Sequence, residues 1–297
     1  MTASTNHGST SQRSTVRVLV VAAPCDEAEI AADALWTYGI TALEERRVGP
    51  VIELRTVVGD LESAAIVGAV AARWPTRIEE VDAAPAETWK RYAAPVRVDD
   101  IVLTPEWCSV DGLGGDAVIV SIDPGAAFGL GDHPTTQLCT SLLARRVRAD
   151  VAAGRAPRVL DVGCGTGVLA IVAARLGARA VVATDTSGVA VENAHHNVDA
   201  NGVGDVVRVT DAPVGAITDR FDIVVANILS PTLVALADEV RRRAERWVIL
   251  SGLLAGRTAD VEEAYVGWSV HAREVLEGWT AIELSADERS DLLPSGQ

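Results

Sequence analysis

The sequence predicts a two-domain α/β protein, in which a small ferredoxin-like α+β domain precedes a larger doubly wound domain with a mostly parallel sheet. From residue 17 to 84, strand-like and helix-like segments follow the order βαββαβ, which is typical of the split ferredoxin-like arrangement. From Arg158 onward, strands alternate with helices, as in a parallel sheet covered by helices. Residues 269–286 hold two strand-like runs around Glu277 and Gly278, which predict an antiparallel hairpin at the end of that sheet.

The composition is that of a globular protein. The 297 residues allow one large domain or two ordinary ones, and 48% of them are hydrophobic. No apolar run approaches the roughly 20 residues that cross a bilayer. Residues 1–14 are rich in Ser and Thr and lack the apolar core of a secretory signal, so we expect a flexible tail and a cytoplasmic protein.

Charge and cysteine usage exclude several classes of function. The formal net charge of −15 disfavours binding to nucleic acid phosphates; it suits a basic partner, or serves only solubility. The four cysteines form no CxxC pair, which argues against a zinc site and against a disulfide framework. They are Cys25, Cys108, Cys139 and Cys164. We expect no metal and a reducing compartment.

The first domain is expected at residues 15–84, followed by a linker at 85–107 and the second domain at 108–297. The first domain contains no group of residues typical of a catalytic site, so we expect it to be a module that recognises a substrate. Its predicted strands are 17–23, 40–47, 51–58 and 76–84, and its predicted helices are 26–39, closed by Gly39, and 61–74.

The second domain alternates strands and helices regularly. Its predicted strands are 117–123, 158–162, 180–185, 206–211, 223–227 and 247–252, and its predicted helices end at Gly177 and Asn201 and span 231–247. In doubly wound sheets the ligand lies at the carboxyl ends of the strands. The candidate site residues are therefore sought at those ends.

The stretch LDVGCGTGVLA, residues 160–170, places three glycines at alternate positions between two apolar runs. Gly163, Gly165 and Gly167 let the backbone turn sharply and approach a ligand without interference from a Cβ atom. The spacing is GxGxG, whereas a dinucleotide fingerprint has its third glycine where Val168 stands, so a smaller nucleoside ligand is favoured. We expect Gly163 and Gly165 to contact it.

Two aspartates end the next two predicted strands. Asp185 is placed to accept hydrogen bonds from the ribose hydroxyls of a nucleoside; the alternative is a helix N-cap. Asp211 is placed to meet the adenine amino group, or lies in a solvated turn. The glycine turn and Asp185 together favour S-adenosylmethionine as the ligand.

The stretch FDIVVANILSP ends a buried strand in Asn227, and Pro231 begins the next helix. An amide oxygen at this place accepts a hydrogen bond from an amine and aims the nitrogen lone pair at a methyl donor. The pattern is similar to the Asn-Pro-Pro-aromatic motif of many N-methyltransferases, although Ile228, Leu229 and Ser230 follow the Asn here. The alternative is an Asn that satisfies loop backbone groups.

A glycine-rich loop and a helix start precede the first long strand of the second domain. In DPGAAFGLGDHPTTQLCTSLL, residues 123–143, the loop surrounds Phe128, a candidate ligand contact. Pro134 suits the first turn of the helix, and Thr136 offers a hydroxyl group. His133 has either a structural or a catalytic role.

These segments together resemble the family of ribosomal protein L11 methyltransferases, the PrmA type. The resemblance rests on AFGLGDHPTT, LDVGCGTGVLAIVAARLGA, DTSGVAVENAHHNVDANGV, VVANILSPTLVALADEV and LSGLL, in that order, and extends to ETWKRYAAPVRV. It implies a Rossmann-like class I methyltransferase domain that binds S-adenosylmethionine. It also implies an N-terminal ferredoxin-like module that recognises ribosomal protein L11 as substrate.

The family's cofactor contacts carry over onto Thr136, Gly163, Asp185 and Asn227. The family loop usually reads AFGTGTHPTT, whereas this chain has Leu130 and Asp132 in place of the two threonines. The resemblance implies transfer of methyl groups to lysine or N-terminal amines, with Asn227 as the catalytic residue.

Three alternatives stay open. The chain could be a lysine methyltransferase that acts on another protein, such as the electron-transfer flavoprotein beta subunit. It could be a nicotinamide-dependent oxidoreductase, which Val168 and the terminal hairpin disfavour, or a noncatalytic binding module. We expect no direct contact with nucleic acid or membrane.

Overall fold

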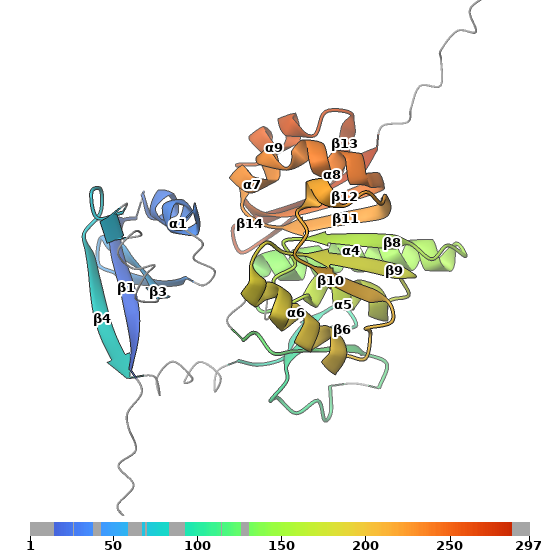
Figure 1. The fold of residues 1–297 in the computed structure, drawn as a ribbon, viewed down its shortest axis with the longest axis horizontal. Coiled ribbons are helices and arrows are strands. Elements are labelled where there is room, and N and C mark those ends of the chain that lie inside the picture. The colour runs from blue at the N-terminus through green and yellow to red at the C-terminus, as the bar shows by residue number, and fades with distance from the viewer. Residues whose placement is uncertain are drawn as a thin grey trace, which may run out of the picture. The chain divides into compact units, whose positions relative to one another are not determined.

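The computed structural model divides the chain into two compact units, Met1–Ala93 and Ala94–Gln297 (Figure 1). The boundary lies inside the linker expected at 85–107, because the second half of that segment forms two strands of the larger unit. The described residues are 15–25, 27–37, 43–58, 67–68, 70–82, 93–113, 115–125 and 131–286.

The smaller unit contains a four-stranded antiparallel sheet in the order β2-β3-β1-β4. This order is the ferredoxin-like one and confirms the predicted arrangement. The strands are β1 Thr15–Pro24, β2 Glu44–Val48, β3 Val51–Val57 and β4 Thr76–Asp82, with α1 at Ala28–Thr37. Gly39 and most of the helix predicted at 61–74 lie outside the described residues.

The core of the smaller unit forms where apolar residues at alternate positions of β1 face the helix side of the sheet. Leu19 and Val21 are fully buried and pack in one cluster with Leu54 of β3 and Leu35 of α1. Period-two spacing on the strands and helical spacing on α1 bring these side chains to one layer. The unit therefore has its own hydrophobic core.

The larger unit is built on a seven-stranded sheet in the order β10-β9-β8-β11-β12-β14-β13. β14 runs antiparallel to both of its neighbours, β12 and β13, whereas the pairs from β10 to β12 are parallel. The strand order reverses direction between β8 and β11. Such a reversal opens a crevice at the carboxyl ends of the two strands. The strands are β8 Arg158–Val162, β9 Ala180–Thr184, β10 Val207–Thr210, β11 Phe221–Asn227, β12 Ala244–Leu254, β13 Trp268–Leu276 and β14 Trp279–Ala286.

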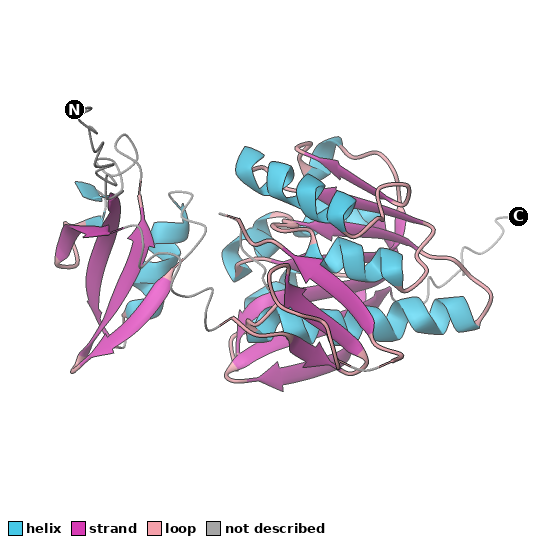
Figure 2. Cartoon of the chain, turned by 90° about the horizontal axis from the view of Figure 1, so that it is seen from below, coloured by secondary structure: helices cyan, strands magenta, loops and turns pink. Residues whose placement is uncertain are grey.

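Helices cover both faces of this sheet (Figures 1 and 2). Strand residues alternate between two buried clusters: Val159 and Ile223 pack with α4, α5 and α6, whereas Leu160 and Val224 pack with α7, α8 and α9. The helices are α4 Pro134–Ala152, α5 Val168–Arg175, α6 Gly188–Ala200, α7 Ser230–Ala235, α8 Ala237–Arg243 and α9 Ala259–Ala264. The predicted doubly wound sheet is thus confirmed.

A separate three-stranded sheet precedes α4, in the order β5-β6-β7. Its strands are β5 Val96–Val98, β6 Ile101–Pro105 and β7 Val118–Ile122. Leu103 and Val120 are buried and pack into the cluster that contains α4, α5 and α6.

Among the described residues, no helix is long and apolar enough to cross a membrane.

The helix predicted at 231–247 is wrong in two respects. It is divided at Leu236 into α7 and α8, and the chain is extended from Ala244 onward as β12. Ala244 pairs with Phe221, the first residue of β11. Residues whose apolar spacing also suits a helix are therefore part of a β-strand. Pairing with a neighbouring strand thus outweighs local helical periodicity.

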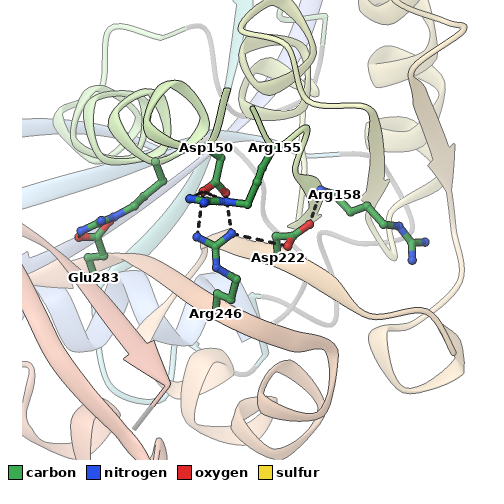
Figure 3. A network of polar contacts seen from close by, with 7 residues as sticks. Asp150, Arg155, Arg158, Asp222, Arg246 and Glu283 are labelled. Carbon is green, nitrogen blue, oxygen red and sulfur yellow. Dashed lines mark hydrogen bonds and ion pairs between the residues drawn. The ribbon is translucent and has the colours of Figure 1, made fainter. Parts of the chain in front are cut away.

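A network of ion pairs ties α4 to the amino ends of the strands (Figure 3). Asp150, buried near the end of α4, accepts hydrogen bonds from Arg155 and Arg246 at 2.7 to 2.9 Å. Burial raises the pKa of Asp150, but the hydrogen bonds from the two guanidinium groups outweigh it and hold that pKa below its usual value. Arg246 also pairs with Asp222, which accepts from the Arg158 amide at 2.8 Å. The network therefore holds α4 against the amino ends of the strands, which lie opposite to the predicted ligand site.

Candidate functional site

The candidate site lies at the carboxyl ends of β8, β9 and β11, where the strand order reverses. Gly163 follows β8, Asp185 follows β9 and Asn227 ends β11. Thr136 comes to the same edge from the first turn of α4, because its Oγ1 accepts a hydrogen bond from Asn227 Nδ2 at 3.3 Å. The structure therefore gathers four predicted residues from separate parts of the sequence.

The glycine turn joins β8 to α5 through three residues with positive φ. The values are +68° at Gly163, +52° at Gly165 and +79° at Gly167, a region that residues with a Cβ atom rarely adopt. The amides of Gly163 and Cys164 both donate to the Thr184 carbonyl at the end of β9, at 2.8 and 3.0 Å. The turn is thereby tied to the neighbouring strand.

Glycine at position 163 also has a structural role that was not predicted. A Cβ atom at Gly163 would lie 2.4 Å from Cγ2 of Ile228, the residue after Asn227. The missing side chain therefore makes room for a protein neighbour. The carbonyl of Ile228 is equally close to Gly252 at the end of β12, where a Cβ atom would lie 2.2 Å from it. Ile228 is thus enclosed by two glycines.

Asp185 binds the glycine turn directly. Its Oδ2 accepts from the Gly165 amide at 3.0 Å, and its Oδ1 accepts from the Ser187 amide at 2.9 Å. Ser187, and not Asp185, is the N-cap of α6. Each carboxylate oxygen has two acceptor positions. Because one is used on each oxygen in these bonds, Asp185 retains acceptor capacity for a ligand with two hydroxyl groups.

A second carboxyl group lies beneath the turn. Asp161 of β8 is 1% exposed, and its Oδ2 accepts from the amide of Ala170 in the first turn of α5 at 3.1 Å. Burial raises the pKa of Asp161 to about 7, although the hydrogen bond from Ala170 lowers it; the nearby charge of Asp185 raises it further. Asp161 therefore changes its charge near neutral pH inside the core.

Asp161 makes the stability of the larger unit depend on pH. Its folded pKa of about 7 lies above the value near 3.9 of an unfolded chain, so the folded state binds the extra proton between these values. The stabilisation by that proton is present at low pH and is lost as the pH rises through about 7. Relative to Asp161→Asn, we expect the free energy of unfolding to fall by about 2.5 kcal/mol between pH 5 and pH 8.

Urea unfolding of the two proteins at a series of pH values measures this difference. The variant keeps a carbonyl oxygen for Ala170, so the titration alone is removed. If the difference in the free energy of unfolding between the wild type and Asp161→Asn is constant from pH 5 to pH 8, Asp161 does not titrate in this range.

Sequence reasoning missed two asparagines that place the segment before the glycine-rich loop. Asn197 of α6 accepts from the Asp123 amide at 2.8 Å and donates to the Asp123 carbonyl at 2.9 Å and to the Thr166 carbonyl at 3.0 Å. Asn201, one turn later, accepts from the Ser121 amide at 3.1 Å and donates to the Ser121 carbonyl at 2.6 Å. The sequence pattern that could have indicated these contacts is the spacing of four residues between asparagines on one helix face.

The remaining predicted residues have different outcomes. Asp211 is exposed in the turn after β10, and its contact with a ligand stays a prediction. Phe128 and Leu130 lie outside the described residues. Asp132 is exposed, and its carbonyl accepts from Gln137 Nε2 at 2.8 Å.

The predicted absence of a metal centre stays a prediction. None of the four cysteines forms a disulfide, and burial raises the pKa of the Cys139 and Cys164 thiols, so both stay protonated. Glu106, Asp123 and His196 offer ligand-type atoms within 4.8 Å of one another. Glu106 and His196 are exposed, and their side chains lie 3.7 Å apart.

The strand order, the single antiparallel strand β14 and the glycine turn define a Rossmann-like fold of the class I methyltransferase type. The chain belongs to the ribosomal protein L11 methyltransferase (PrmA) family, whose model matches residues 49–287.

Relatives and a solved structure agree with this assignment. A ribosomal protein L11 methyltransferase of Citrifermentans bemidjiense is 42% identical over 204 residues, which cover 67% of this chain and 64% of that protein. The protein of the same name from Geobacter sulfurreducens is 40% identical over 221 residues, covering 73% and 70%. The crystal structure of ribosomal protein L11 methylase from Lactobacillus delbrueckii subsp. bulgaricus has a TM-score of 0.59 and 29% identity, covering 66% of this chain and 100% of that one. The chain thus spans about two thirds of the length of the curated relatives that it matches.

Proposed function

We propose that this protein is an S-adenosylmethionine-dependent N-methyltransferase that methylates lysine or N-terminal amino groups of ribosomal protein L11. The observation that carries the proposal is the Thr136–Asn227 pair beside the glycine turn and Asp185, in a chain of this family. The relatives named above carry L11 in their names.

The residues at the turn fit S-adenosylmethionine. Asp185 retains one acceptor position on each oxygen, which suits the two ribose hydroxyls of a nucleoside. Glycines with positive φ at positions 163 and 165 let the backbone approach a ligand closely. When bound, S-adenosylmethionine supplies a methyl group on a positively charged sulfur, which a neutral amine attacks in line.

The chain's own contribution is mainly the placement of the amine. Thr136 Oγ1 accepts a hydrogen bond from the Asn227 amide nitrogen, which fixes the amide plane and leaves Asn227 Oδ1 as an acceptor. We propose that Oδ1 accepts an N–H of the substrate amine and so directs the nitrogen lone pair at the methyl carbon. Reacting atoms held about 3 to 3.5 Å apart and aligned gain most of the available acceleration.

The amine must lose a proton before it attacks. A lysine with an ordinary pKa near 10.4 is almost fully protonated at pH 7, and its neutral form costs roughly 4 to 5 kcal/mol there. An α-amino group with a pKa near 8 costs much less. Transfer to lysine therefore rises steeply with pH, and transfer to an N-terminus rises less.

We propose that the smaller unit recognises the protein substrate in the cytoplasm. It is a separately packed ferredoxin-like module, and none of the proposed catalytic residues belongs to it. The chain as a whole has a net charge of −15, which suits a basic partner such as a ribosomal protein.

Intact-mass spectrometry of purified ribosomal protein L11, incubated with the protein and S-adenosylmethionine, tests the proposal. We expect mass gains in steps of one methyl group, and none without the cofactor. The electron-transfer flavoprotein beta subunit is the matched alternative substrate. Methylation of that subunit and not of L11 would overturn the substrate, and methylation of neither would overturn the activity.

A chain that lacks Met1–Ala93 tests the role of the smaller unit. Ala94–Gln297 is the other compact unit, so we expect it to bind S-adenosylmethionine as the full chain does. We expect it to leave L11 unmethylated. Undiminished methylation by the shortened chain would remove the recognition role.

A further inference from the structure

The first turn of α4 is capped by an imidazole. His133 is the N-cap residue, with φ −68° and ψ 137°, and its Nδ1 accepts from the Thr135 amide at 3.3 Å. The Thr135 hydroxyl lies 2.7 Å from the same nitrogen. Ser, Thr, Asp and Asn are the usual N-cap residues, because their side-chain oxygen atoms accept a hydrogen bond throughout the pH range near neutrality. An imidazole accepts at Nδ1 only while that nitrogen carries no proton.

The capped turn carries part of the candidate site. Thr136 follows directly, is fully buried and accepts at Oγ1 from Asn227 Nδ2. The amides of Thr136 and Gln137 both donate to the His133 carbonyl, at 3.0 and 3.2 Å. The conformation at His133 therefore determines where the helix begins, and with it the place of the Thr136 hydroxyl opposite Asn227.

The surroundings of the ring favour its neutral form. His133 is partly buried, and its ring meets Trp279 of β14 edge to face, with centroids 5.0 Å apart. Burial lowers the pKa of His133; the charges of Asp132, from the segment before α4, and of Glu277, from the β13–β14 turn, raise it by less. The partial positive charge at the start of α4 also disfavours an imidazolium.

We propose that His133 is a positioning residue for the cofactor and amine site, whose neutral imidazole caps α4 and so holds the Thr136 hydroxyl against Asn227. The effect of His133 on the cofactor site rests on the proposed function, whereas the capping of α4 by His133 does not depend on it. Protonation at Nδ1 turns this nitrogen into a donor. The Thr135 hydroxyl then accepts from it, whereas the Thr135 amide loses its acceptor, which removes the cap and loosens the first turn.

Three variants test this proposal. His133→Asn keeps an accepting oxygen at the N-cap and removes the titration. His133→Ala removes both. His195→Asn is the matched control, because His195 is exposed on α6 and lies outside the site. Affinity for S-adenosylmethionine is measured by calorimetry from pH 8 to pH 5.5, without a protein substrate, so that the acceptor amine does not contribute.

We expect His133→Asn to bind as the wild type does at pH 8. At pH 5.5, the low end of the series, the wild type should have lost more affinity than His133→Asn, by up to about fivefold, as expected for the loss of one helix cap. His133→Ala should be weaker than both at pH 8, and His195→Asn should follow the wild type throughout. The Asp161 titration is common to all four proteins and cancels in their ratios. Parallel pH profiles of the wild type and His133→Asn would overturn the proposal.

Urea unfolding without cofactor separates this inference from the proposed function. The pKa of His133 is lowered in the folded state, so the stabilisation by its neutral form is present above 6.5 and is lost as the pH falls below it. We expect the unfolding midpoint of the wild type to fall relative to that of His133→Asn between pH 8 and pH 5.5. If this shift appears while no protein binds S-adenosylmethionine, the cap is supported and the proposed function fails.

Discussion

Replacement of Gly252 with alanine is expected to destabilise the larger unit severely and to displace the loop after β11. Gly252 has φ +90°, and a Cβ atom there would lie 2.2 Å from the carbonyl oxygen and 2.8 Å from the carbonyl carbon of Ile228. Backbone atoms of a residue next to a buried strand cannot move away without moving Asn227. We expect the free energy of unfolding to fall by about 3 kcal/mol or more, measured by urea unfolding.

Gly256→Ala is the matched control. Gly256 has a similar φ of +83° but nothing within 4 Å of its Cβ position, so it reports the backbone strain alone. That strain costs about 1 to 2 kcal/mol. Equal losses in the two variants would show that the contact with Ile228 is unimportant.

Gly163→Ala offers a complementary comparison. Its clash is with Cγ2 of the Ile228 side chain, so Ile228→Ala in the same chain should recover part of the loss. Gly252→Ala should gain nothing from Ile228→Ala, because its clash is with the backbone. Rescue of both, or of neither, would contradict this account of the enclosed Ile228.

Asn227→Ala is expected to reduce turnover far more than affinity for the cofactor. The proposal gives the amide oxygen its main role with the attacking amine, and loss of one positioned hydrogen-bonding group in an active site typically costs about 100-fold or more in kcat. We expect the dissociation constant for S-adenosylmethionine to change by less than about tenfold. Single-turnover methylation of L11 and calorimetry with the cofactor measure the two quantities.

The comparison of these two losses decides the role of Asn227. An equal loss of turnover and affinity would show that Asn227 mainly holds the cofactor. The unfolding midpoint in urea is the control, since the side chain also fixes Thr136. Thr136→Ser keeps the hydroxyl that orients Asn227 and should therefore stay close to the wild type in turnover.

Much of the fold was predictable because its signals are local. Alternating strands and helices predicted the parallel sheet, and the Glu277–Gly278 turn predicted the final hairpin. The carboxyl ends of parallel strands meet at one edge, so Asp185 and Asn227 could be placed near the glycine turn from their positions in the sequence. The contact of Asn227 with Thr136 could be anticipated only through the family resemblance.

Other features depend on contacts between distant segments and leave no local pattern. Gly252 lies in a strand, and only the packed structure shows that the backbone of Ile228 comes against it. The extended chain at Ala244 follows from its pairing with Phe221 and overrides a helical pattern. A strand as short as β5 likewise resembles a connecting segment, so its residues were included in the predicted linker.

The proposed function depends on the binding of S-adenosylmethionine by the turn after β8 and by Asp185. Calorimetric titration of the full chain with S-adenosylmethionine, repeated in the presence of excess NAD, measures this binding. We expect one molecule bound per chain and no effect of NAD. Absence of binding, or displacement of S-adenosylmethionine by NAD, would show that this site is not a methyl-donor site.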